Sequence, residues 1–130
     1  MTIRIASLES IPPVHMPGRD LRWVISQQTL ATSVLGMAVM DAPGYSVVRP
    51  CHGHKDVEEV LFILEGQGDA WVDGEEASFK AGDAVFFPPN SKHQVRNTGP
   101  GNLRTCSIFS HPNPPQTYVT YEGQGFDAAS

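Results

Sequence analysis

Short segments rich in β-branched and apolar residues, separated by turns, constrain the fold of this chain more than any other feature of its sequence. Such composition favours strands, and turns at close intervals favour many short strands over a few long elements. No stretch shows the sustained periodicity of an amphipathic helix. The pattern predicts an all-β fold, an antiparallel sandwich or barrel. The expected strands are residues 21–26, 30–40, 45–51, 59–64, 70–72, 77–79, 84–87, 93–97 and 103–110.

The connections between these segments carry recognisable turn residues. Asp73-Gly74 is a strong hairpin signal of the type that requires positive φ angles at the turn. Residues 41–44 and 80–83 read as further turns, and the 12 glycines and 11 prolines are concentrated in such connections. The length of 130 residues matches one compact domain with a real hydrophobic core.

The charge pattern excludes two classes of partner. The net charge is -5 at pH 7, and the basic residues are scattered, so we expect no nucleic-acid partner and no attraction to an anionic membrane. The longest strongly apolar run, residues 60–64, is far too short to cross a bilayer, and residues 1–10 lack a continuous apolar segment of signal-peptide type. A cytoplasmic location is therefore expected.

Four residues point to a metal site. His52 and His54 lie one residue apart, Glu59 follows five residues later, and His93 lies on a later segment. Alternate side chains of a strand share a face, so the first two imidazoles project to the same side. Imidazole and carboxylate ligands suit a divalent transition metal such as Mn, Fe, Ni or Zn. Taken singly, each residue is more often a hydrogen-bonded or solvent-facing side chain, so their joint spacing carries the prediction.

These residues and their neighbours resemble the motifs of the cupin superfamily. The first motif of that family has His-x-His, a Glu and a Gly, here His52 to Glu59 and Gly66; the second has a Gly, a Pro, a His and an Asn, here Gly82, Pro88, His93 and Asn97. Two family glycines are replaced, by Ser46 and Asn90. Asn tolerates a left-handed backbone, so the turn before His93 can still form.

The resemblance implies a small single-domain cupin, an antiparallel jelly-roll barrel over residues 21–110. Residues 1–20 contain three prolines and are expected to form an extended arm, and residues 111–130 an extended tail. The arm either frays or covers a sheet edge, in its own subunit or in a partner's. The resemblance implies a homodimer formed in this way.

The ligand set predicts a metal-dependent enzyme for a small oxygen-rich metabolite, such as a sugar acid, a 2-oxo acid or a dicarboxylate. Three imidazoles and one carboxylate leave about two positions free on a six-coordinate ion. We expect an anionic or polyol ligand there, and an isomerase, epimerase, lyase or decarboxylase reaction. Two alternatives remain open: an iron-dependent dioxygenase and a non-catalytic barrel that binds or senses a small ligand. Within the dioxygenases, the presence of Glu59 argues against the thiol-dioxygenase branch, which resembles a three-histidine site.

Further candidates surround the expected site. His111 follows the last expected strand and is a candidate proton donor at the opening. Basic side chains are candidates to pair with an anionic substrate: Arg22, Arg49, Lys92 and Arg96. Because imidazoles must be neutral to bind a metal, up to three protons compete with the ion. Metal affinity is therefore expected to fall steeply below pH about 6.5, and the stability of the metal-free protein to change less.

Overall fold

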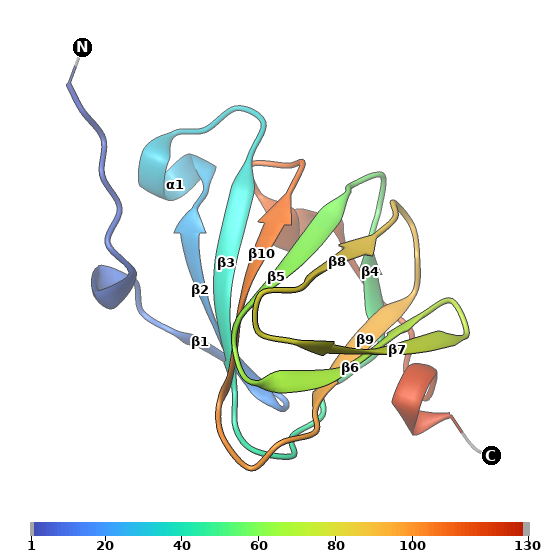
Figure 1. Cartoon of the computed structure of the whole chain (residues 1–130). Coiled ribbons are helices and arrows are strands. Elements are labelled where there is room, and N and C mark those ends of the chain that lie inside the picture. The colour runs from blue at the N-terminus through green and yellow to red at the C-terminus, as the bar shows by residue number, and fades with distance from the viewer. Residues whose placement is uncertain (1, 129–130) are drawn as a thin grey trace.

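The computed structural model describes residues 2–128 and is built mainly from two antiparallel sheets that pack against each other (Figure 1). The predicted all-β jelly roll is confirmed. The first sheet has the order β1 (Val14–Met16), β2 (Arg19–Ile25), β3 (Gly36–Ala42), β10 (Leu103–Phe109), β5 (Glu59–Glu65), β8 (Ala84–Phe87). The second has the order β11 (Tyr118–Thr120), β4 (His52–His54), β9 (His93–Asn97), β6 (Gln67–Val72), β7 (Glu75–Lys80).

Helices are short and lie in the connections. They are η1 (Leu8–Ser10), α1 (Gln27–Leu30), η2 (Pro114–Thr117) and η3 (Gly125–Asp127). Ser26 caps α1 because its side chain accepts a hydrogen bond from the backbone N–H of Thr29. No helix between residues 2 and 128 has the length and apolar character needed to cross a membrane.

The core lies between the two sheets because each sheet turns its apolar face inward. Leu61, Ile63 and Leu103 come from the first sheet, and Phe79 and Val95 from the second; all are buried in one cluster. Alternation along the strands produces this core, since every second side chain of a strand points to the same face. Leu61 and Val95 of this cluster also line a cavity between the sheets, so the hydrophobic core forms part of the cavity wall.

The turn chemistry read from the sequence is confirmed at two places. Asp73 and Gly74 have φ angles of 47° and 96°, as the hairpin between β6 and β7 requires. Asn90 has φ 64°, so it adopts the left-handed conformation expected for a residue in place of the family glycine. Its side chain also accepts a hydrogen bond from the backbone N–H of Asp56 at 3.0 Å, which ties the loop before His93 to the loop after His54.

Both ends of the chain differ from the expected arm and tail. Strand β1 lies within residues 1–20 and pairs with β2, so the barrel begins earlier than residue 21. Strand β11 pairs with β4 at the edge of the second sheet, and the 3-10 helices η2 and η3 flank it, so residues 111–128 are not extended throughout. The prolines favour an extended arm and tail. Tyr118–Thr120 is β-prone, but a segment of three residues is too short to be predicted as a strand from its pattern.

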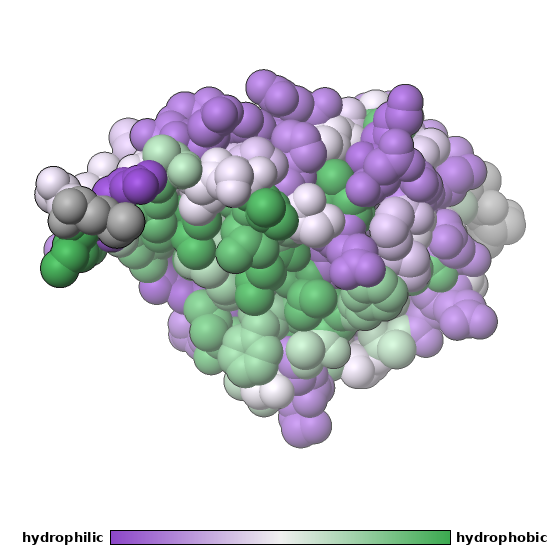
Figure 2. Space-filling view, turned by 90° about the horizontal axis from the view of Figure 1, so that it is seen from above, coloured by the Kyte–Doolittle hydropathy of each residue, from purple (hydrophilic) through white to green (hydrophobic). Residues whose placement is uncertain are grey.

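Large apolar side chains also lie on the outside of the first sheet. Phe62, Phe86 and Ile108 are 40%, 51% and 44% exposed, and Cα partners across β10, β5 and β8 place them on one face. Figure 2 shows that hydrophobic side chains form a broad patch on the surface seen from above. Exposed patches of this kind mark interaction surfaces in soluble proteins.

Candidate metal centre

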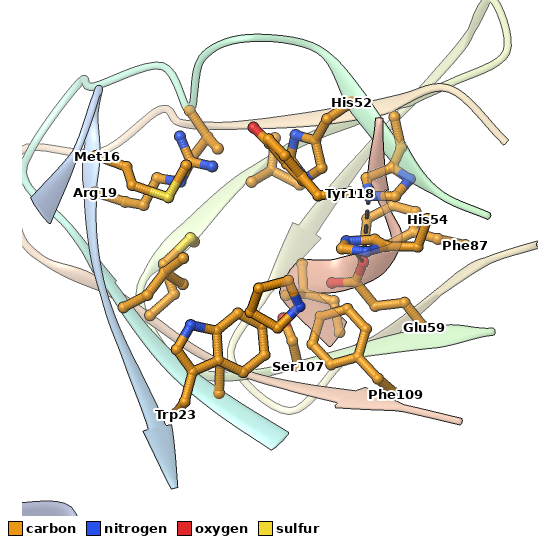
Figure 3. A pocket seen from close by; sticks show the side chains of 18 of the residues that line it. Met16, Arg19, Trp23, His52, His54, Glu59, Phe87, Ser107, Phe109 and Tyr118 are labelled. Carbon is orange, nitrogen blue, oxygen red and sulfur yellow. Dashed lines mark ion pairs between the residues drawn. The ribbon is translucent and has the colours of Figure 1, made fainter. Parts of the chain in front are cut away.

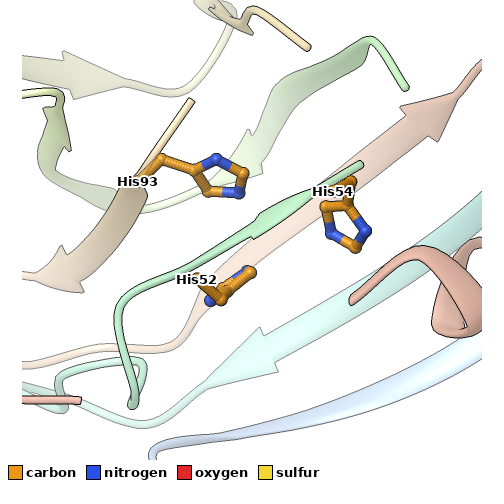
Figure 4. A group of neighbouring side chains, drawn as sticks. All are labelled: His52, His54 and His93. Carbon is orange, nitrogen blue, oxygen red and sulfur yellow. The ribbon is translucent and has the colours of Figure 1, made fainter. Parts of the chain in front are cut away.

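Strands β4 and β9 place three histidines around one point. His52 and His93 are direct partners across the antiparallel pair, and His54 lies two residues from His52 on the same face. One ring nitrogen from each of the three lies within 4.8 Å of the others, as Figure 4 shows for the three rings. This spacing suits three imidazoles that share one ion.

Glu59 reaches the histidines from the opposite sheet. It begins β5, and its Oε1 lies 3.2 Å from Nε2 of His93 and 3.6 Å from Nε2 of His54. Two ligands on adjacent positions of an ion, each about 2.1 Å from it, lie about 3 Å apart. The three histidines form the group that could hold an ion, and Glu59 lies beside two of them, His54 and His93, although these residues come from three strands of two sheets.

Hydrogen bonds fix the tautomers of two histidines. Nδ1 of His52 lies 2.9 Å from the carbonyl oxygen of Pro50, which only accepts, so Nδ1 carries the proton. Nδ1 of His54 lies 2.9 Å from the hydroxyl of Thr117, which donates its own proton to the carbonyl of Pro114. That hydroxyl must accept from His54. In both rings Nε2 therefore keeps its lone pair, as a metal ligand requires.

The remaining polar atoms of the cluster lack partners. Glu59 Oε1 and both ring nitrogens of His93 are buried and have no partner in hydrogen-bond geometry, although Glu59 Oε1 and Nε2 of His93 approach to 3.2 Å. Buried polar groups without a partner are rare and cost stability. A cation between Glu59 and the histidines would satisfy the carboxylate oxygen and one ring nitrogen of His93, so the donor set fits a divalent metal.

Burial and neighbouring charges shift the pKa values of His52, His54 and Glu59 in the directions that favour metal binding. Burial lowers the pKa of His52 to about 3 and also lowers the pKa of His54. Burial alone would raise the pKa of Glu59, but His93, His54 and His52 outweigh it and lower the pKa of that carboxyl overall. A neutral imidazole at His52 and at His54 and an ionised carboxylate at Glu59 are thus favoured at neutral pH.

The cluster lies at one side of a cavity of about 340 Å³ between the sheets (Figure 3). Most of its lining is apolar or aromatic, and the polar side chains beside the four candidate ligands are Arg19, Ser107 and Tyr118. The largest apolar residues of the lining are Met16, Leu21, Trp23, Met40, Leu61, Phe87 and Phe109. A ligand here meets a mainly hydrophobic wall with a few polar groups.

None of these three polar groups was predicted as a site residue from the sequence. Tyr118 lies beside the rings of His52 and His54, and its hydroxyl is buried without a hydrogen-bond partner. Arg19 lines the same cavity from β2. Tyr118 belongs to the C-terminal segment, and only the pairing of β11 with β4 brings that segment to the site. No local motif marks either residue.

The other sequence candidates lie elsewhere. His111 is not among the residues that line the cavity, and its Nδ1 accepts a hydrogen bond from the backbone N–H of Asn113 at 2.9 Å. Arg22, Arg49 and Arg96 each pair with an aspartate and do not line the cavity either. Lys92 lies over the ring of Tyr121, outside the lining.

Residues 38–109 match the family model described as a cupin domain. This chain belongs to the cupin family. The match covers more than half of the chain and includes all four candidate ligands. Among curated relatives, this cupin is 31% identical over 126 residues to the protein named polyketide synthase CurC from Streptomyces cyaneus, an alignment that covers 94% of this chain and 80% of the relative.

Solved structures share the fold at lower sequence identity. A predicted oxalate decarboxylase from Thermotoga maritima has a TM-score of 0.72 and 23% identity, and the match covers 82% of this cupin and 98% of that chain. Pac13 from Streptomyces, described as a nucleoside dehydratase, has a TM-score of 0.78 and 12% identity over 93% of this cupin and 92% of that chain. Both similarities confirm the small barrel fold.

Proposed function

We propose that this cupin is a metal-dependent enzyme whose single divalent ion is held by His52, His54, Glu59 and His93. The observation that carries the proposal is the set of buried, unpartnered potential ligand atoms on Glu59 and His93. They lie in the same cluster as the Nε2 atoms of His52 and His54, which keep free lone pairs. Thr117 and the carbonyl of Pro50 orient those two rings from behind. Four protein ligands leave about two positions for a ligand on a six-coordinate ion.

We infer a reaction without redox change: isomerisation, epimerisation, elimination or decarboxylation. A bound ion would supply the polarisation of a carbonyl or carboxylate oxygen. The hydroxyl of Tyr118, unpartnered beside His52 and His54, is then placed to donate a proton to the substrate or to accept one. The apolar walls exclude water around these groups, which strengthens each polar contact inside the cavity.

The lining refines the class of substrate. A polyol or sugar acid would leave its hydroxyl groups against Leu61, Phe87 and Phe109, where few partners exist. A mainly apolar carbon skeleton with a few oxygen donors suits this cavity better. Similarity to a protein named as a polyketide synthase component supports such a substrate, since polyketides are carbon chains or rings that carry carbonyl and hydroxyl groups.

Elemental analysis of natively purified protein tests the proposal. We expect one equivalent of a divalent metal per chain, restored after chelation by Mn(II), Ni(II) or Zn(II), and no oxygen uptake with candidate substrates. Iron together with oxygen uptake would favour the alternative of a dioxygenase, for which the open positions and apolar cavity are also suitable. A protein that binds none of these metals would contradict the proposal and favour a metal-free binding barrel.

We also propose that two copies form a dimer through the outer face of the first sheet. Phe62, Phe86 and Ile108 supply an apolar centre, and the ion pair of Asp41 with Arg104 lies at its margin, which is the composition of an interface. Ile3 and Ile5 of the N-terminal segment are 84% and 81% exposed on an arm that leaves the body of the molecule (Figure 1). A second copy would cover both apolar features in one two-fold contact.

Sedimentation of the wild type should show a dimer, and sedimentation of the double variant Phe62→Asp/Ile108→Asp should show a folded monomer. Two buried charges without partners would destabilise the dimer contact by several kcal/mol, which raises the dissociation constant by about a hundredfold or more. Val34→Asp is the matched control, since Val34 is 61% exposed in the loop before β3. A wild type that remains monomeric at all practical concentrations would exclude the dimer.

A further inference from the structure

Arg19 differs from the other arginines in the barrel because it is buried and has no acidic partner. It is only 5% exposed, and no carboxylate lies within ion-pair distance of it among the described residues. Four other arginines, all more exposed, pair with aspartates: Arg22 with Asp41, Arg49 with Asp127, Arg96 with Asp69 and Arg104 with Asp41. Buried charges are almost always paired, so the exception calls for a partner.

Backbone carbonyls satisfy only part of the guanidinium. Nη1 donates to the carbonyl of Pro17 at 3.1 Å and also to the carbonyl of Arg49. No described residue accepts a hydrogen bond from Nε or Nη2, and the side chain lines the cavity. These two nitrogens point in one plane, the arrangement with which arginine binds the two oxygens of a carboxylate.

The position of Arg19 suits a ligand that spans the cavity from Arg19 to the histidine cluster. Figure 3 shows Arg19 beside Met16 on the side of the cavity away from Glu59, and Trp23 on another wall, at the lower left of the view. Its charge nonetheless reaches His52, whose pKa it helps to lower. The ligand cluster contributes three neutral imidazoles and one anion, so a divalent ion would leave a net charge of about +1 there, and Arg19 adds a second positive charge.

We propose that Arg19 is the anion-binding residue of this cavity. The ligand is then an organic anion: an apolar body against Trp23 and Phe109, oxygen donors at the metal cluster, and a carboxylate or enolate oxygen that accepts from Nε and Nη2 of Arg19. The identity of the cluster as a metal site rests on the proposed function, whereas the charge preference set by Arg19 does not. The inference selects an anionic ligand over a neutral polyol.

A purely structural role makes a different prediction. Through Nη1, Arg19 also ties the turn between β1 and β2 to the loop that precedes His52. If that were its whole role, loss of the guanidinium would disturb charged and neutral ligands alike. Only an anion-binding role predicts that loss of the guanidinium lowers the affinity for the anion and leaves the affinity for the neutral ligand unchanged.

Isothermal titration calorimetry with 2-naphthoate and its neutral counterpart 2-naphthamide separates these roles. We expect the zinc-loaded wild type to bind the anion more tightly than the amide. Arg19→Gln should lower the affinity for 2-naphthoate by about tenfold or more, whereas the affinity for 2-naphthamide should change by less than about twofold. Arg22→Gln is the matched control: it makes the same change on the same strand, outside the cavity, and should alter neither ligand. Zinc content of each variant is measured in parallel.

The metal-free protein distinguishes a failure of this inference from a failure of the metal proposal. Chelated wild type should still prefer 2-naphthoate to 2-naphthamide, by about threefold or more, and Arg19→Gln should abolish that preference. Equal binding of the two probes by the wild type, or an equal loss of both in Arg19→Gln, would overturn the inference even if zinc binds. If Arg19→Gln does not fold, the comparison of the two probes on metal-free wild type still decides, because equal affinities there exclude an anion site.

Discussion

Replacement of His54 or His93 by alanine is expected to reduce zinc occupancy of the purified protein by about tenfold or more, because each ring supplies one of four ligands. The double variant His52→Ala/His54→Ala should retain almost no zinc. Occupancy is read by elemental analysis after dialysis against zinc at a fixed free concentration. Circular dichroism should still report a β protein, since the hydrophobic core is intact.

His15→Ala is the matched control for these variants. His15 is exposed and pairs with Asp20, away from the cluster, so its loss should leave zinc occupancy unchanged. The double variant with full stoichiometric zinc would show that the ion binds elsewhere. A tenfold loss in the cluster variants with none in His15→Ala ties the ion to the site.

The pH dependence of zinc affinity should be shallower than for three solvent-exposed histidines. In the folded metal-free protein the pKa of His52 is lowered to about 3, so this ring has no proton to lose when zinc binds between pH 5 and 7. The pKa of His54 is lowered as well. We therefore expect the logarithm of affinity to change by no more than about two per pH unit, against three for unperturbed rings.

The same shifts make the metal-free protein sensitive to acid as well. An unfolded chain binds a proton at His52 below pH about 6.5 and the folded state does not, so stability present above that pH is lost as pH falls. Each such histidine contributes a slope of about 1.4 kcal/mol per pH unit, and His54 acts in the same direction. Chemical unfolding of chelated protein between pH 7.5 and 5 measures this slope, and a flat profile would contradict the burial of neutral rings.

The sequence was sufficient to predict the all-β fold and the grouping of the three histidines, partly from local strand and turn patterns and partly from the family motif. His52 and His54 share a face by strand alternation alone, and Asp73-Gly74 and Asn90 specify their turns through backbone geometry. The family motif then supplied Glu59 and His93, which the structure brings to the same point from two other strands.

The rest of the site depends on long-range packing that no local pattern encodes. Tyr118 reaches the cavity because a C-terminal strand adds to the edge beside β4, and Thr117 is placed behind His54 by the same contact. Arg19 looks like any surface arginine in the sequence, and only its burial without a carboxylate singles it out. His111 was a reasonable proton donor by position, but the turn after β10 takes its ring away from the cavity lining.

X-ray absorption spectroscopy of the zinc-loaded wild type tests the metal site most directly. The geometry predicts a shell of nitrogen and oxygen at about 2.0–2.1 Å with the outer-shell scattering of three imidazoles, and the loss of one imidazole in His93→Ala. Cys51 and Cys106 are free and do not belong to the cluster, so no sulfur scattering is expected. A shell with sulfur, or with one imidazole or none, would contradict the assignment of His52, His54 and His93 as joint ligands.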